Sequence, residues 1–141
     1  MRDKEPRKVL LEWVVRTYFD ALAKGDFDMI PYDENVSLRA PLAPAGVHHP
    51  LVGKENLRNI WWAPLPSIVG GTRIYGIFFN EDLTVVADEP EIEVTNPKAT
   101  LLVADRFTVN EAGKIVEQEN HFDPRDVTNP GRNKPGVLQG R

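Results

Sequence analysis

The sequence contains no cysteine, which excludes disulfide bonds, metal sites built on thiolates and a cysteine nucleophile. It also has no run of about 18 apolar residues, the length that a membrane-spanning helix needs. Lysine and arginine do not cluster, and the net charge of −4 argues against nucleic acid as a partner. Because the charged N-terminus has no apolar segment of the kind found in signal peptides, we expect a cytoplasmic protein.

Histidine is scarce, and its spacing does not suggest a metal site. The three histidines are His48, His49 and His121, and no HxH or HxxxH pattern joins them. We therefore expect no bound metal, and the chemistry considered below needs no other cofactor.

The 141 residues and the apolar content of 41% fit one globular domain with a real core. Apolar residues within 7–24 repeat at helical spacing, and Gly25 stands where it can cap the C-terminus of that helix. A second amphipathic helix is predicted to begin at Gly53 and to end at Pro64. Its inward face is expected to carry Leu57, Ile60 and Trp61.

Alternation of apolar and polar residues predicts strands at 36–40, 74–79, 83–94, 99–109 and 114–122. Pro90 cannot donate to a strand ladder, so we expect a bend or bulge there. Helices followed by a run of antiparallel strands are typical of an α+β fold. We predict one domain over residues 1–123. Residues 124–141 form a Pro-, Gly- and Arg-rich tail, either loose or laid on another surface.

Three stretches carry a resemblance to a known superfamily, namely residues 14–26, 50–55 and 105–123. In these stretches the chain resembles the nuclear transport factor 2-like superfamily, and within it the SnoaL-like and ketosteroid isomerase-like domains. The resemblance implies a cone-shaped, curved antiparallel sheet wrapped around N-terminal helices, described as a cystatin-like α+β barrel, with one apolar pocket. It also implies a hydrophobic small-molecule ligand and a homodimer formed through the outer face of the sheet.

Two residues match the catalytic positions of the ketosteroid isomerases. Tyr18 falls where that family keeps its oxyanion-hole tyrosine, and Asp105 where it keeps a protonated aspartic acid. Two such donors on one oxygen would stabilise an enolate. Taken singly, Tyr18 also fits a core tyrosine bonded to the backbone. Asp105 also fits a carboxylate paired with an arginine, or a residue on the opposite face of its strand.

The same comparison shows two departures. Ala40 stands where the isomerases keep their general base, and Asn120 stands where many epoxide-hydrolase-like and SnoaL-like relatives carry an aspartate. Neither can act as a base, although Asn120 can orient a ligand. Asp88 falls on an apolar, inward face of its strand and could act as acid or base instead. The alternative is that a bulge at Pro90 turns Asp88 outward.

The remaining candidates are expected to line the pocket. His48 and His49 lie in a loop that overhangs the pocket mouth in this fold, where a histidine could carry a proton or simply be solvated. Aromatic lining is expected from Trp61, Phe107 and Phe122. For Trp61 core packing is the stronger interpretation, and aromatic residues such as Phe107 fill cores in any case.

These residues leave three interpretations open. The first is an enzyme that isomerises, dehydrates or cyclises a hydrophobic carbonyl compound through an enolate, without a cofactor. The second is a non-catalytic ligand-binding or accessory domain that keeps the pocket, as Ala40 and Asn120 would suggest. The third is an interaction domain whose dimer and tail are the functional parts.

Overall fold

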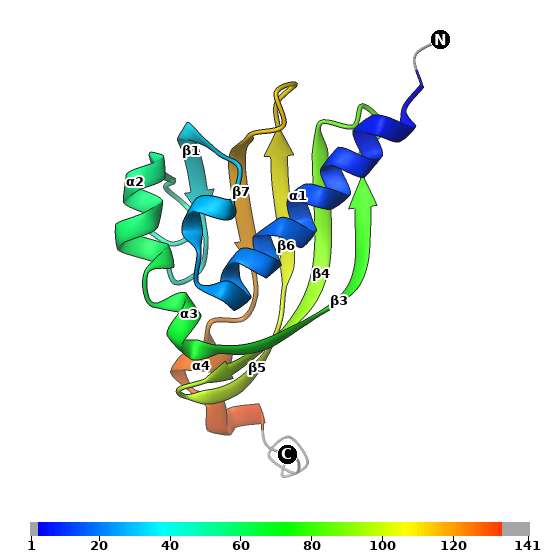
Figure 1. Cartoon of the computed structure of the whole chain (residues 1–141). Helices are drawn as coiled ribbons and strands as arrows, with labels where there is room; N and C mark the ends of the chain where they lie inside the picture. Colours follow the sequence, from blue (N-terminus) through cyan, green and yellow to red (C-terminus); the bar gives the residue numbers. More distant parts are fainter. Residues whose placement is uncertain (1–2, 134–141) are drawn as a thin grey trace.

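The computed structural model describes residues 3–133, which form one curved sheet and a set of mostly short helices (Figure 1). In chain order the elements are α1 (Glu5–Lys24), η1 (Phe27–Met29), β1 (Tyr32–Arg39), β2 (Leu51–Val52), α2 (Lys54–Asn56), η2 (Leu57–Trp62), α3 (Leu65–Ile68), β3 (Val69–Phe79), β4 (Val85–Thr95), β5 (Lys98–Leu102), β6 (Ala104–Val109), β7 (Ile115–His121), α4 (Arg125–Thr128) and η3 (Pro130–Asn133). Residues 134–141 of the expected tail lie outside the described part of the chain. Its first ten residues contain α4 and η3.

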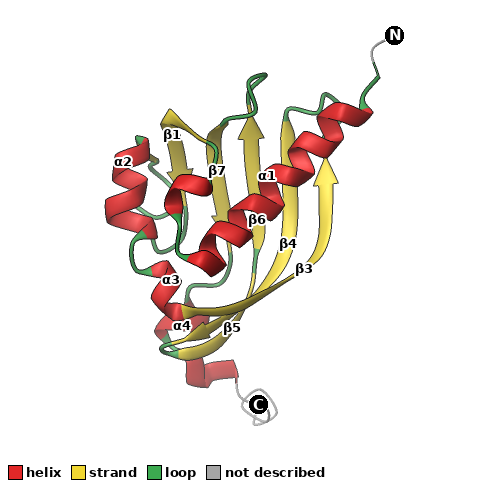
Figure 2. Ribbon diagram, viewed as in Figure 1, coloured by secondary structure: helices red, strands yellow, loops and turns green. Residues whose placement is uncertain are grey.

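The strands follow the order β2-β1-β7-β6-β4-β3, and β5 pairs with the far half of β4. The sheet curves around α1, which crosses its concave side, and the shorter helices lie toward one end (Figure 2). This arrangement confirms the predicted α+β cone. The sheet is mixed, however, because β1 pairs with β7 in parallel. A long connection leads from β1 to the other strands, so no hairpin forces β1 and β7 to run in opposite directions.

Helix α1 has the predicted apolar face and the predicted cap. Its inward residues, among them Leu11, Val15 and Tyr18, are buried in the core. Gly25 adopts a left-handed conformation with φ of 67°, and the next amide, of Asp26, donates to the carbonyl of Ala21. The helix therefore ends at a fixed point and holds Tyr18 over the sheet.

The predicted second helix forms as a short α2 that continues directly into the wide π-type η2, and the separate α3 begins after Pro64, where the prediction ended the helix. As a consequence, Ile60 is 50% exposed, whereas Trp62 is buried against Phe27. In a wider turn, residues five apart share a face, so Leu57 and Trp62 point inward together. Trp61 is only partly buried.

The predicted strand 99–109 is divided at Val103 into β5 and β6. There β4 changes partner, from β6 at Asp88 to β5 at Glu91, and the Val103 amide donates to the carbonyl of Pro90. Pro90 is therefore accommodated at the point where the ladder changes partner. Asp88 stays on the inward face, with 1% of its surface exposed.

Arg7 ties the start of α1 to the far end of the sheet. Its guanidinium donates to the carbonyls of Leu83, Val109 and Asn110 at 2.8–3.0 Å. Charged donors to partly buried carbonyls are among the stronger hydrogen bonds in proteins. This contact fixes the tilt of α1 across the sheet, and with it the position of Tyr18.

We expect the Arg7→Met change to lower the free energy of unfolding by about 1.5–3 kcal/mol, because three carbonyls lose a charged donor. Chemical denaturation measures this directly. Lys8→Met is the matched control, since the Lys8 side chain lies in an exposed ion pair with Glu5. Equal effects of the two changes would show that Arg7 contributes no more than a surface charge.

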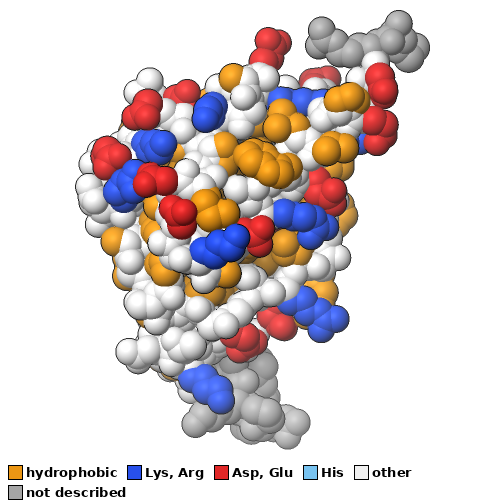
Figure 3. All heavy atoms as spheres, viewed as in Figure 1, with side chains coloured by type: hydrophobic (Ala, Val, Ile, Leu, Met, Phe, Trp, Pro, Cys, Tyr) orange, Lys and Arg blue, Asp and Glu red, His pale blue; other side chains and the backbone are white. Residues whose placement is uncertain are grey.

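Acidic and basic side chains are intermixed on the face that carries α1 (Figure 3). No helix in the described part of the chain is long and apolar enough to cross a membrane.

Candidate active site

A cavity of about 120 Å³ lies between the concave side of the sheet and the helices. Most of its wall is apolar. Its polar residues are Tyr18, Asp105 and Asn120. The apolar residues that line it are Leu22, Ala40, Leu42, Trp61, Leu65, Ile68, Val69, Ile92, Val94, Leu101, Val103, Phe122 and Val127. Among the residues that the structure describes, no lysine, arginine or histidine lines this cavity.

Strand register brings the polar residues together. Asp88 on β4 lies opposite Asp105 on β6, and Asp105 lies opposite Asn120 on β7. All three face the concave side and are at most 7% exposed. Tyr18 comes from α1, which crosses this row. The result is a line of three polar side chains across the sheet, covered by a tyrosine.

The hydrogen bonds in this row are incomplete. The Asn120 amide nitrogen donates to Asp105 Oδ1. Asn120 Oδ1 and both carboxylate oxygens of Asp88 are buried and accept no hydrogen bond from any group within residues 3–133. Buried polar atoms without partners are uncommon, and each one calls for a physical explanation.

The two carboxyl groups explain part of this pattern, because together they retain a proton. Burial, and then the neighbouring charge of Asp105, raise the pKa of Asp88 to about 10. Burial also raises the pKa of Asp105, to about 6, against hydrogen bonds from Asp88 and Asn120 and the nearby charge of His121. A proton on Asp88 that is donated to Asp105 gives one Asp88 oxygen a partner and leaves the other without one. At neutral pH the pair therefore carries one negative charge, centred on Asp105, the carboxyl that lines the cavity.

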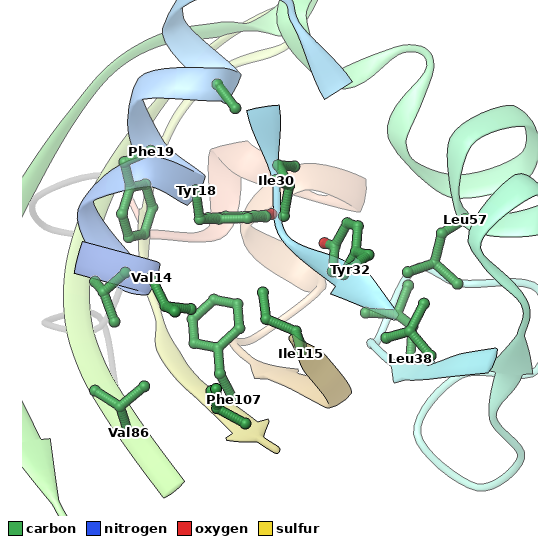
Figure 4. Packing of buried hydrophobic residues seen from close by; sticks show 14 of the residues in the cluster. Val14, Tyr18, Phe19, Ile30, Tyr32, Leu38, Leu57, Val86, Phe107 and Ile115 are labelled. Carbon is green, nitrogen blue, oxygen red and sulfur yellow. The ribbon is translucent and has the colours of Figure 1, made fainter. Parts of the chain in front are cut away.

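Tyr18 supplies a hydrogen-bond donor at the same place. Burial, and then the charge of Asp105, raise the pKa of Tyr18 far above its usual value, so its hydroxyl stays protonated. The Tyr32 hydroxyl donates to Gln118 Oε1. The Gln118 side chain also interacts with the Tyr18 hydroxyl, and this interaction opposes part of the rise in the pKa of Tyr18. Figure 4 shows the two tyrosine hydroxyls pointing toward each other, above Phe107 and Ile115.

The sequence-based candidates divide into two groups. Three predicted lining residues, Ala40, Trp61 and Phe122, contribute to the cavity wall with the polar residues. Asp88 lies behind Asp105 and does not itself line the cavity. The inward face that the alternation predicts for Asp88, Asp105 and Asn120 is the face that the structure gives them.

Three candidates lie elsewhere. Phe107 is fully buried in the core, with its ring 5.4 Å from that of Tyr18, so it supports the tyrosine and does not line the cavity. His48 and His49 are exposed. His48 lines a separate surface hollow beside Phe122, and of the 41–49 loop it is Leu42, not a histidine, that reaches the cavity.

Two residues of the polar network, Tyr32 and Gln118, were not singled out as site residues by the sequence reasoning. Gln118 is 1% exposed and lies two residues before Asn120, so its position on the inward face was available as a signal. Tyr32 lies at the first position of β1, before the alternation that predicts a strand at 36–40, and the sequence pattern gave no sign of its role.

The fold and the cavity define a class of protein, an α+β cone that encloses a small, mainly apolar cavity. The chain belongs to the SnoaL-like domain family, whose model matches residues 15–118. A search of curated proteins found no match.

Solved structures show the same fold. SalBIII, an epoxide hydrolase/cyclase-like enzyme of pyran ring formation in polyether salinomycin, is 22% identical, with a TM-score of 0.70 over 89% of this chain and 97% of that one. A steroid delta-isomerase from Pseudomonas aeruginosa is 18% identical, with a TM-score of 0.66 over 84% and 82%. RV0760c from Mycobacterium tuberculosis, in complex with estradiol-17beta-hemisuccinate, is 10% identical, with a TM-score of 0.68 over 81% and 94%. Structural neighbours thus bind hydrophobic small molecules.

Proposed function

We propose that this protein is a cofactor-independent enzyme that moves a proton on a neutral, mainly apolar carbonyl compound. Asp105 is the base, and Tyr18 donates to the carbonyl oxygen. Asp88 holds the one proton that the carboxyl pair retains at neutral pH, and Asn120 orients Asp105. One observation carries the proposal: a buried carboxyl, still ionised at neutral pH although burial raises its pKa to about 6, lies at the polar end of an apolar cavity, next to a tyrosine hydroxyl.

The reaction follows from these groups. The Asp105 carboxylate takes a proton from the carbon next to the carbonyl, and the electrons of that C–H bond move onto the carbonyl oxygen. The Tyr18 hydroxyl stabilises the resulting enolate oxygen by a hydrogen bond. Asp105 then returns the same proton at another carbon of the conjugated system. The net change is a shift of the double bond, and the enzyme ends in its starting state.

This assignment differs from the roles suggested by the ketosteroid isomerases, in which the residue matching Asp105 is the protonated donor. Here the Asn120 amide donates to Asp105, which favours the carboxylate form of Asp105. The proton that the carboxyl pair retains lies on Asp88 instead. The assignment also accounts for Ala40, which stands where the isomerases keep their general base, because Asp105 takes the role of the base in this protein.

The proposal is tested by the conversion of cyclohex-3-enone to cyclohex-2-enone, a one-ring ketone suited to a cavity of about 120 Å³. We expect catalysis by the native chain and a rate about 10- to 100-fold lower for Tyr18→Phe, the equivalent of one lost hydrogen bond to developing charge. The control is Tyr75→Phe, since Tyr75 is 58% exposed on β3. Absence of catalysis above the buffer rate with this and larger neutral ketones would refute the proposal.

A second reaction is favoured by the shared proton and by the free Asn120 Oδ1. Asn120 Oδ1 and Asp105 can together accept hydrogen bonds from one water molecule, which Asp105 would activate to open an epoxide. Tyr18 would donate a hydrogen bond to the epoxide oxygen, and the proton that Asp105 takes from the water would pass to the resulting alkoxide, so that the diol leaves and the enzyme returns to its starting state. The measurement is the formation of cyclohexane-1,2-diol from cyclohexene oxide. Diol without ketone isomerisation would favour this reaction over the first.

Ligand binding without either reaction would support the alternative of a non-catalytic binding domain. We also expect a homodimer formed through the outer face of the sheet, where Tyr75, Phe78 and Leu102 are exposed. Sedimentation of the native chain tests that expectation.

A further inference from the structure

The polar end of the cavity carries an unbalanced charge that proton transfer alone does not explain. Asp105 is 3% exposed and lines the cavity, and neither Asp105 nor Asp88 takes part in an ion pair within residues 3–133. The described lining also includes no basic side chain. A buried carboxylate without a cation is costly, because the protein has removed it from water without a full replacement.

Hydrogen-bond acceptors also outnumber donors at this end. Asn120 uses its amide nitrogen on Asp105, which leaves Asn120 Oδ1 buried and without a donor. On the cavity lining, the donors are the Tyr18 hydroxyl and the two N–H groups of the Asn120 amide, one of which goes to Asp105, whereas the acceptors are both oxygens of Asp105 and Asn120 Oδ1. A ligand that carries several N–H donors and a positive charge would therefore complete both the charge and the hydrogen bonding.

The apolar wall limits what the rest of such a ligand can be. Trp61 and Phe122 lie among aliphatic side chains around the cavity, so the ligand body must be apolar. The volume of about 120 Å³ is close to the roughly 150 Å³ of an apolar cavity that binds benzene. An aromatic wall also favours a nearby cation.

We propose that this cavity binds small apolar amines as ammonium ions, with the ammonium group donating to Asp105 and Asn120 Oδ1 and the ring packed against the apolar wall. The inference rests on the ionised Asp105 that the proposed function also requires, but it does not require any reaction. It adds a ligand class that would occupy the site and block turnover.

The test compares three ligands of nearly equal size by calorimetry at pH 8: benzylamine, benzyl alcohol and benzoate. We expect benzylamine to bind about tenfold or more tightly than benzyl alcohol, as a charge-assisted hydrogen bond allows, and benzoate to bind weakest. Asp105→Asn should remove the preference for the amine while it keeps the binding of the alcohol. Glu89→Gln, which removes an exposed acid beside Asp88, should keep the preference.

Equal affinity for amine and alcohol, or a preference that survives Asp105→Asn, would overturn the inference. Alcohol binding by the variant shows that its cavity is still folded. Amine binding with no activity on any ketone or epoxide would refute the proposed function alone. Activity without amine preference would refute this inference alone.

The preference should also depend on pH. The groups that act on Asp105 are Asp88 on β4, Tyr18 on α1, and Asn120 and His121 on β7. Protonation of the carboxyl pair below about pH 6 removes its charge, so the advantage of benzylamine should diminish there. An advantage that is unchanged at pH 5 would mean that another acid holds the amine.

Discussion

The Asp105→Asn change is expected to lower the rate of cyclohex-3-enone isomerisation by about 100- to 10,000-fold, the usual contribution of a general base. Asparagine has nearly the same shape and can still exchange a hydrogen bond with Asn120, but it cannot accept the proton. The affinity for the ketone should change little, because the ligand is held mainly by the apolar wall. The measurement is kcat and KM determined separately.

Two controls separate a lost base from a damaged fold. Glu89→Gln makes the same chemical change on the exposed face of β4 and should leave both constants unaltered. The pH profile of the native enzyme should rise through about pH 6, as the cavity-lining carboxyl of the pair loses its proton. An Asp105→Asn enzyme that keeps more than a tenth of the native rate would show that Asp105 is not the base.

The sequence was sufficient for the fold and for the side of the sheet on which the candidates lie. Alternation places Asp105 and Asn120 inward without any knowledge of the strand partners, since the side-chain period of a strand is two. The pairing of Asp88 with Asp105 depends instead on register, and register follows from the partner change of β4 near Pro90. No local pattern determines that change.

Other features depend on packing between distant segments. The wide turn η2 decides that Trp62 enters the core and leaves Trp61 to the cavity, whereas an ordinary helix would direct Trp61 inward. Phe107 shares the predicted inward face with Asp105, but α1 lies directly over it and places it beneath Tyr18. Which carboxyl holds the proton follows from the Asn120 hydrogen bond, and this is a property of the folded site alone.

The Asp88→Asn change is expected to make the protein more stable in alkaline solution. Both aspartates are ionised in the unfolded chain above about pH 5, whereas the native pair retains one proton up to about pH 10. The native state therefore binds more protons than the unfolded state between these values. Its stability must fall as pH rises, by at most about 1.4 kcal/mol per pH unit for one proton.

Asparagine at position 88 can donate an N–H to Asp105 in place of the shared proton, so folding no longer takes up a proton at this pair above about pH 6. The free energy of unfolding of the variant should then change little between pH 7 and 9, while that of the native protein falls by about 1–3 kcal/mol. Urea denaturation at pH 7, 8 and 9 measures both slopes. Glu89→Gln should keep the native slope, because Glu89 is exposed.

Parallel slopes for the native protein and Asp88→Asn would mean that the pair holds no proton in this range, and that Asp88 is not the proton holder. If the slopes diverge as expected, the buried pair lowers stability at neutral pH in order to keep a charged carboxyl in an apolar cavity. A structural role gives no reason to retain such a pair, since neutral residues would pack there with less cost. The divergence would thus favour catalysis or ligand binding at Asp105 over the interpretation of this chain as an inert interaction domain.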